Sequence, residues 1–179
     1  MTEANKNRLA VHAYKQALIV PRQKKRCHRS RIGCFADGKS VPWSNSDMVF
    51  RPSTPQVANA PLVKARNIDK EVLFIGTLWC AWGHLITDFS RHLWPLLSAD
   101  PDLPVAYAVG SPKQKLPRNF MQLLEALGVS SDRLIEVREP MRFRKVYFGE
   151  PSFWHDTSRG QCVWTAEYAE TVDAVIKGI

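Results

Sequence analysis

Three side chains that together could move a proton and hold an anion lie within eight consecutive positions: His84, Asp88 and Arg91. Separations of four and three residues place them on one face if the segment is helical. An imidazole beside a carboxylate can act as a base with its orienting group, and a guanidinium can bind an anion. The spacing leaves open which of His84 and Asp88 is the base. It also fits an exposed polar face on which the His–Asp pair only stabilises the helix.

A strand and a helix are expected to position these side chains. The four apolar residues Val72–Ile75 are followed by Gly76, a pattern typical of a buried strand. Apolar residues then recur at helical spacing, namely Leu85, Ile86, Phe89, Leu93 and Leu96. A strand, a glycine-containing turn and a helix begin a βαβ unit, in which ligands bind at the carboxyl end of the strand. We therefore predict the site at that end of the strand, next to Gly76.

The segment Trp82–Trp94 resembles a motif of glycosyltransferase family 61, W-G-H-F-L-x-D/E-x-x-x-R-x-W. Six positions match this pattern in register: Trp82, Gly83, His84, Asp88, Arg91 and Trp94. A second segment, Lys145–Ser152, resembles the short strand and turn that follow in members of the family. The resemblance covers roughly residues 70 to 179.

This resemblance implies transfer of a sugar from a nucleotide-sugar donor to an acceptor hydroxyl in polysaccharide or glycan synthesis. Asp88 or His84 would be the catalytic base, because a hydroxyl is a poor nucleophile until its proton is removed. Arg91 would hold an anion of the acceptor or orient the carboxylate. The other expected substrate contacts are Trp82, Gly83 and Gly76. Neither a cofactor nor a metal is expected in the chain, since helix dipoles and cationic groups can offset the charge of the donor diphosphate.

Tryptophan side chains offer a further possible contact with a sugar. Trp79, Trp82 and Trp94 could stack on a sugar ring, although large aromatic side chains near such a helix more often belong to the core.

The family fold is GT-B, in which two Rossmann-like domains face each other across a cleft. Residues 1–179 contain no counterpart of the His- and Gly-rich segment that lies near the donor phosphates, and no glycine-rich phosphate-binding loop. The resemblance therefore implies a truncated, acceptor-side half that lacks the C-terminal donor-binding domain. On this interpretation the isolated chain catalyses no transfer. Its partners are a saccharide acceptor and the missing domain or a second chain.

Beyond residue 71, short apolar runs alternate with helical patterns. This predicts an α/β fold with an open, mostly parallel, Rossmann-like sheet and helices on both faces. The expected strands lie at 72–75, 104–109, 134–137 and 144–148, and the expected helices near 120–127 and 163–176. The last helix would direct a set of apolar residues inward: Ala166, Ala169, Val172 and Ile176.

The first 70 residues are expected to lie outside this α/β domain. Asn5–Ile19 is predicted to be a helix that ends before Pro21. The expected organisation is a basic N-terminal helix and arm at 1–36, an irregular or β-rich segment at 37–70, and the Rossmann-like domain at 71–179.

The net charge of +8 belongs to the N-terminal 36 residues. These contain nine Lys and Arg residues and one Glu (9 − 1 = +8), and the remainder contains 16 basic and 16 acidic residues. The stretch Arg22–Arg31 could contact nucleic acid or an anionic membrane surface. A solvated linker fits it better, because aromatic residues are not interleaved with the cations. Two other functions therefore stay open: a non-catalytic carbohydrate- or protein-binding module, and a nucleic-acid binder with strongly salt-dependent affinity.

Cysteine usage and hydropathy favour a cytoplasmic protein, peripheral at the inner membrane surface if the basic arm binds there. The four cysteines have no CxxC spacing, which disfavours a zinc site or a disulfide framework. Cys80 and His84 are four residues apart, but two ligands do not make a metal site. No apolar run is long enough to cross a membrane, and the N-terminus lacks the pattern of a secretory signal.

Overall fold

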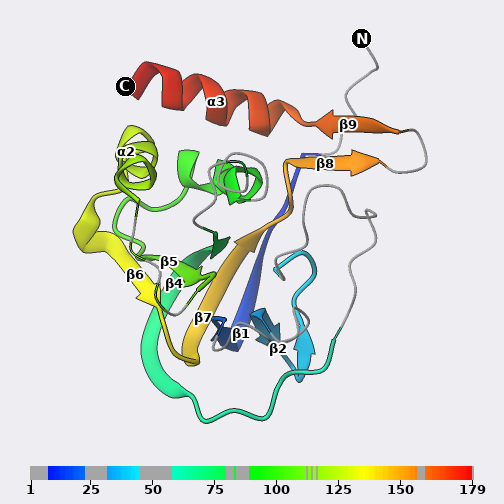
Figure 1. The fold of residues 1–179 in the computed structure, drawn as a ribbon, viewed down its shortest axis with the longest axis vertical. Helices are drawn as coiled ribbons and strands as arrows, with labels where there is room; N and C mark the ends of the chain where they lie inside the picture. Colours follow the sequence, from blue (N-terminus) through cyan, green and yellow to red (C-terminus); the bar gives the residue numbers. More distant parts are fainter. Residues whose placement is uncertain are drawn as a thin grey trace.

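The computed structural model in Figure 1 describes residues 8–22, 32–44, 58–79, 83, 89–111, 113, 115, 117–156 and 160–178. Its main element is a seven-stranded sheet in the order β3-β2-β1-β7-β4-β5-β6. The strands of this sheet are β1 Val11–Val20, β2 Gly33–Ala36, β3 Lys39–Ser40, β4 Arg66–Leu78, β5 Val105–Val109, β6 Leu134–Val137 and β7 Met141–Gly149. The other elements are the hairpin β8 Phe153–Asp156 and β9 Gln161–Trp164, the helices α2 Arg118–Ala126 and α3 Ala166–Gly178, and the 3-10 turns η3 Ser90–His92, η4 Trp94–Leu97 and η5 Ser131–Arg133.

The sheet is mixed. Strand β4 pairs in parallel with β5 and β7, and β5 pairs in parallel with β6. Strand β1 is antiparallel to both β7 and β2, and β2 is antiparallel to β3. The predicted α/β fold with an open, mostly parallel Rossmann-like sheet is therefore wrong. The parallel part is continued by an antiparallel part that sequence analysis placed outside the domain.

Two hydrophobic cores lie on opposite faces of β4. Leu73 and Ile75 pack with residues of η4 and α2, whereas Val72 and Phe74 pack with residues of β1, β2 and β7. Adjacent side chains of a strand point to opposite faces, so this alternation is expected of a strand that is covered on both sides. In Figure 1 the helices cover one face of the parallel strands. The second face is covered by the sheet itself.

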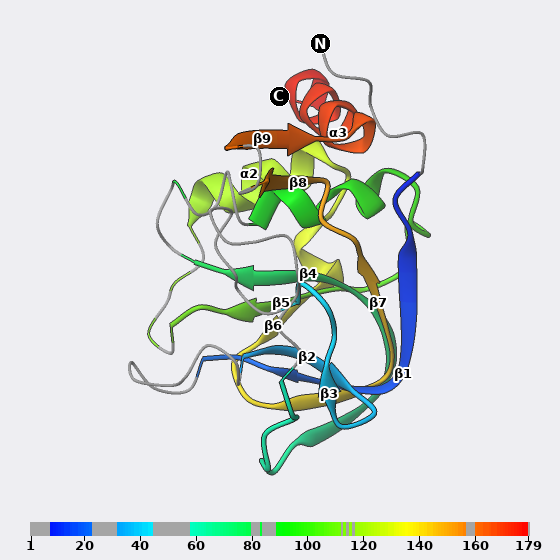
Figure 2. The same cartoon turned by 90° about the vertical axis from the view of Figure 1, so that its right-hand side faces the viewer.

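The sheet covers its own second face because its long strands bend. In Figure 2, β2 and the carboxyl half of β1 lie below β4 and β5. Both long strands contain an irregularity. The pairing of β4 with β7 shifts register between Ile68 and Glu71, and Gln16 in β1 has a φ of 49°. Such irregularities locally increase the bend and twist of a strand. The amide of Arg22 then donates to the carbonyl of Val109 at 3.2 Å, which ties the chain after β1 to the end of β5.

Several elements lie where the sequence predicts them. The predicted strands at 72–75, 134–137 and 144–148 occur within β4, β6 and β7, and the one at 104–109 occurs as β5. The two predicted helices occur as α2 and α3, although Val163 and Trp164, at the predicted start of the last helix, belong to β9. The predicted helix at Asn5–Ile19 is wrong, because Val11–Val20 forms β1. Since β1 pairs with β7 along most of its length, the boundary predicted at residue 71 runs through one continuous sheet.

The orientation predicted for the last helix is also wrong. Ala166, Ala169, Val172 and Ile176 are exposed, and the side of α3 that faces the core carries Thr171, Ala174 and Val175. A threonine is tolerated there because its hydroxyl donates to the Glu167 carbonyl at 2.7 Å. Within the described residues, no helix combines the length and hydropathy needed to span a membrane.

The burial along β1 predicts unequal costs for two alanine substitutions. Ile19→Ala should lower the free energy of unfolding by about 2–5 kcal/mol, because Ile19 is fully buried in the core between the two halves of the sheet. Val11→Ala should change it by less than about 0.5 kcal/mol, since Val11 lies at the exposed start of the same strand. Urea unfolding of both variants measures the difference. Equal, small effects would show that β1 contributes little to the core.

Candidate functional site

The end of the predicted site helix lies against the carboxyl end of β7. The amide and the hydroxyl of Ser152 both donate to the carbonyl of Arg91 at 2.9 Å. The indole Nε1 of Trp94 donates to the carbonyl of Glu150 at 2.8 Å. These contacts join two segments about 60 positions apart in the sequence, so the position of η3 and η4 is set by β7 as well as by β4.

Beyond Phe89 the chain forms 3-10 turns, η3 and η4, which are separated by Leu93. Pro95 follows within η4, where it has no amide hydrogen to donate. Helical periodicity across this region therefore predicts correctly which residues are buried, since Phe89, Leu93 and Leu96 are all in the core. It does not predict the backbone conformation, which beyond Phe89 is 3-10.

His92 lies at the centre of these contacts. Its ring centroid is 4.7 Å from that of Phe148, and its Nδ1 is 3.2 Å from the carbonyl oxygen of Gly149. On the β4 side it is next to Gly76, where an added Cβ would lie 3.6 Å from the imidazole Cδ2. Gly76 has φ of 97°, a left-handed conformation that favours glycine. The imidazole is thus enclosed by β4 and β7.

Arg91 and His92 form a buried polar pair. The side-chain Nε–H of Arg91 donates to Nε2 of His92 at 3.1 Å, and the two residues are 5% and 3% exposed. A ring nitrogen that accepts this bond cannot carry a proton, so the proton of neutral His92 is on Nδ1 and is donated to Gly149. Burial lowers the pKa of His92 well below its ordinary value, and the positive charge of Arg91 lowers it further. His92 is therefore neutral at pH 7.

The predicted site residues are only partly brought together in the described structure. Arg91 is buried beside His92, Gly76 lies in β4 next to the same imidazole, and Gly83 is exposed. The remaining predicted site residues lie outside the described residues: His84, Asp88 and Trp82. Sequence reasoning missed His92 and Ser152 as contacts of Arg91, and Gly149 as the hydrogen-bond partner of His92. Two features of the sequence could have indicated these contacts. His92 is next to Arg91 in the chain, and the segment Lys145–Ser152 resembles part of the family pattern, although no role was predicted for it.

Trp79 and Trp94 belong to the structural framework. Trp79 follows β4, and the guanidinium carbon of Arg22 lies 5.2 Å from its ring centroid. Gly110 is also close, because an added Cβ there would lie 2.8 Å from the Trp79 ring. Trp94 is 8% exposed and its Nε1–H is bonded to Glu150. Of the two readings of these tryptophans, core packing is confirmed for Trp94, and Trp79 packs between neighbours from two other segments.

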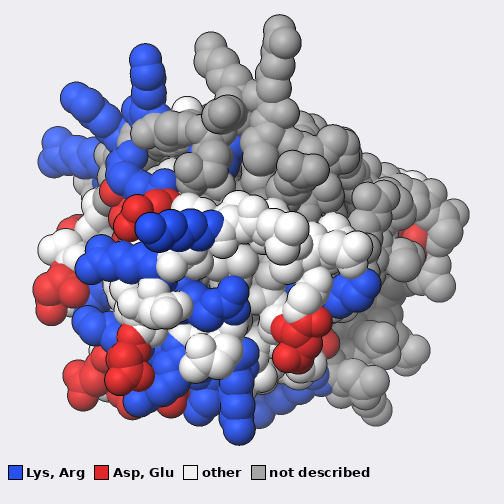
Figure 3. All heavy atoms as spheres, turned by 90° about the horizontal axis from the view of Figure 1, so that it is seen from below, with Lys and Arg blue, Asp and Glu red and all other residues white. Residues whose placement is uncertain are grey.

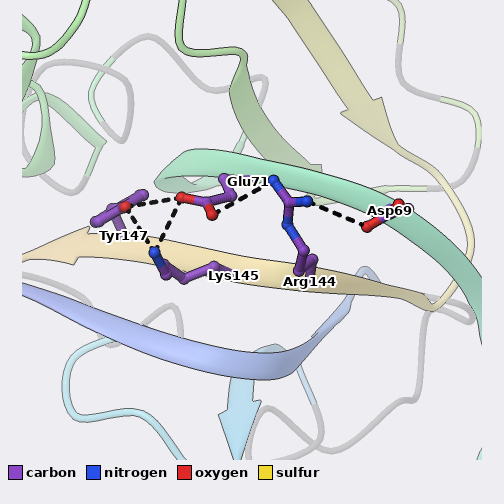
Figure 4. Close-up of polar contacts among 5 residues, drawn as sticks. All are labelled: Asp69, Glu71, Arg144, Lys145 and Tyr147. Carbon is purple, nitrogen blue, oxygen red and sulfur yellow. Dashed lines mark hydrogen bonds and ion pairs between the residues drawn. The ribbon is translucent and has the colours of Figure 1, made fainter.

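A second polar cluster joins β4 to β7 outside this region (Figure 4). The hydroxyl of Tyr147 donates to Glu71 at 2.8 Å, and Lys145 Nζ donates to Glu71 and to Tyr147, each at 3.1 Å. Arg144 extends the cluster to Asp69 at 3.6 Å and to Glu71 at 3.4 Å. The hydrogen bonds from Tyr147 and Lys145 lower the pKa of Glu71. Two acids balance two bases here, so the cluster is best explained as cross-strand pairing.

Cysteine and metal-ligand side chains are dispersed in the described part of the chain. Burial raises the pKa of Cys34 to about 12, so its thiol is unreactive, whereas Cys162 is exposed. Among the described residues no three His, Cys, Asp or Glu side chains are grouped for metal binding. Cys80 and His84, the pair with helical spacing, lie outside those residues.

The close packing of β7 against η4 predicts that Gly149 tolerates no side chain. A Cβ at position 149 would lie 2.6 Å from Pro95 Cγ and 3.2 Å from the Trp94 ring. Gly149→Ala should therefore lower the free energy of unfolding by about 1–3 kcal/mol, measured by urea unfolding. Gly83→Ala is the matched control, since an added Cβ there meets no atom within 4 Å. An unchanged stability of Gly149→Ala would contradict the contact between β7 and η4.

The neutral, buried state of His92 predicts a loss of stability in acid. The unfolded chain binds a proton at His92 near its ordinary pKa, whereas the folded chain binds it only at lower pH. Stability is therefore unaffected by this group above about pH 6.5 and falls below that value, by at most about 1.4 kcal/mol per pH unit. Unfolding free energies at pH 7 and pH 5 measure the effect, and His92→Phe should reduce the difference. A His92→Phe variant with the same pH dependence as the wild type would show that His92 is not the titrating group.

Comparison with known proteins identifies no relative of this chain. No protein-family model, curated protein or solved structure matches the chain. Its function is therefore argued from its own residues and their arrangement.

Proposed function

We propose that this chain binds a saccharide acceptor and provides the acceptor-side part of a glycosyltransferase site. The reaction would transfer a sugar from a nucleotide-sugar donor to a hydroxyl of that acceptor. The proposal rests on the segment that resembles glycosyltransferase family 61 and not on the fold, because unrelated functions share folds and the expected Rossmann-like sheet is absent.

One observation carries the proposal. The described end of that segment, at Arg91, is bonded to the carboxyl end of β7, and His92 lies between β7 and β4. These two strands are parallel neighbours, so their carboxyl ends point the same way. In sheets with parallel strands this end is the usual place for a ligand. The polar face predicted from His84, Asp88 and Arg91 would thus begin at the expected edge.

Each polar residue has a chemical role in this proposal. The acceptor hydroxyl attacks the donor sugar while its proton passes to Asp88 or His84. The other residue of this pair orients the base. Arg91 keeps its positive charge at all relevant pH values and can hold an acidic group of the acceptor or orient the carboxylate of the base.

The basic stretch on which nucleic-acid binding was predicted, Arg22–Arg31, lies outside the described residues beyond Arg22. The described surface adds no support to that prediction. Among the described residues on the face seen from below, Figure 3 shows Lys and Arg side chains interspersed with Asp and Glu. Basic side chains of the described residues also form ion pairs, such as Arg138–Glu136 at 2.6 Å and Arg144–Glu71 at 3.4 Å. A nucleic-acid site needs a basic groove or stripe.

Acceptor binding by residues 1–179 is the direct test. We expect methyl glycosides to bind in saturation-transfer NMR at millimolar concentration, and Arg91→Lys to weaken binding at least about tenfold, since lysine lacks the planar fork. Arg144→Lys is the control, because its 55% exposed side chain pairs with Asp69 and Glu71 of β4. Absence of binding by every glycoside tested, with the protein folded, would refute the proposal.

The assignment of the base is tested in a preparation that also contains a donor site. Asp88→Asn should lower turnover by about two to four orders of magnitude if Asp88 is the base, with acceptor affinity retained. Loss of turnover in His84→Ala together with normal turnover in Asp88→Asn would assign the base to His84 instead.

A further inference from the structure

We infer that His92 is a positioning residue that fixes the plane and direction of the Arg91 guanidinium. The ligand of that guanidinium rests on the proposed function. The positioning itself is a property of the free protein and can be measured without a ligand.

The imidazole is held in one orientation by contacts from two strands. Its Nδ1–H donates to the Gly149 carbonyl at 3.2 Å, and its ring packs on Phe148 with an interplanar angle of 33°. Gly76 of β4 brings backbone against the edge of the ring that carries Cδ2. A ring held in this way can present Nε2 in only one direction. Arg91 Nε is 3.1 Å from that nitrogen.

Both ends of Arg91 are therefore fixed. Its carbonyl accepts two hydrogen bonds from Ser152, and its Nε–H is directed to His92. Because the guanidinium is planar and rigid, the direction of Nε–H also sets the direction of both Nη groups. An oriented pair of Nη groups suits the two oxygens of a carboxylate. That carboxylate can belong to an acidic saccharide or to the protein, as when Arg91 orients the base.

This arrangement works only with neutral His92. In His92⁺ both ring nitrogens are donors, so Nε2–H would point at Arg91 Nε–H and two positive charges would be adjacent. Arg91 is the only charged group that shifts the pKa of His92 among the described residues, and the other groups around the ring are the Gly149 carbonyl, Phe148 and Gly76. No described carboxylate is among the groups that shift the pKa of His92. Acid should therefore release Arg91 from this orientation.

Nitrogen-15 NMR of the unliganded protein tests the positioning. We expect a neutral His92 with its proton on Nδ1 at pH 7, and an Arg91 Nε–H that exchanges slowly with water. As the pH falls and His92 becomes protonated, that Nε–H should lose its protection. A His92 that is protonated at pH 7, or that carries its proton on Nε2, would overturn the inference regardless of any sugar binding.

Two substitutions separate positioning from packing. His92→Phe keeps a ring against Phe148 but removes the acceptor, and His92→Gln restores an acceptor that does not titrate. We expect His92→Phe to bind methyl glucuronide at least about tenfold more weakly than the wild type at pH 7. His92→Gln should recover most of the affinity and retain it at pH 5, where the wild type weakens. His12→Gln is the control, because His12 is exposed and pairs with Glu150 at 3.1 Å.

Comparing a second ligand, methyl glucoside, shows whether the carboxylate held by Arg91 belongs to the saccharide or to the protein. If methyl glucuronide is affected in His92→Phe and methyl glucoside is not, Arg91 holds the acid of the saccharide; if both are affected equally, Arg91 orients a carboxylate of the protein. Normal binding of both by a folded His92→Phe protein would overturn the inference and leave the proposed function intact. An NMR result as expected, without binding of either glycoside, would refute the proposed function and leave the positioning intact.

Discussion

The burial of β4 on both faces is the constraint on which the other elements depend. Its residues from Val72 to Leu78 are all buried, with one set facing the helices and the other facing β1, β2 and β7. A strand of this kind needs a cover on each side, since exposing either row of apolar side chains to water is costly. Helices supply one cover. The bend of the long strands supplies the second, so the antiparallel part is required by the parallel part.

This constraint explains which elements could be predicted from the sequence. The predicted part of β4, Val72–Ile75, and the whole of β5 are short apolar runs that are buried throughout, and α2 has a regular helical pattern. Strand β1 has no such uniform pattern, because its first six residues are largely exposed and Ala17–Val20 are all buried where the sheet folds over. A strand whose environment changes along its length shows neither a period of two nor one of 3.6 residues. The same argument applies to α3, where a buried threonine interrupts the stripe that faces the core.

The candidate site was less predictable than the strands, because its polar contacts are long-range. Arg91 was recognised by its spacing from Asp88, but its surroundings depend on Gly149 and Ser152, 58 and 61 positions away in the chain (149 − 91 = 58; 152 − 91 = 61). Local spacing can identify the residues of one helix face. It cannot identify the tautomer of a histidine, which is set by a carbonyl from another strand. A guanidinium expected at an open surface is therefore found buried in the described structure.

The correction of the fold changes what supports a function for this chain. The expected Rossmann-like sheet would have supported a ligand site only by analogy with other proteins, in which ligands bind where the strand order reverses. The mixed sheet gives a more local argument, in which β4 and β7 run in parallel and the segment containing Arg91 is bonded where β7 ends. The same bonds place a neutral imidazole between the two strands and the guanidinium. Any chemistry at this edge therefore depends on a buried Arg–His pair whose geometry is determined by the packing of the sheet.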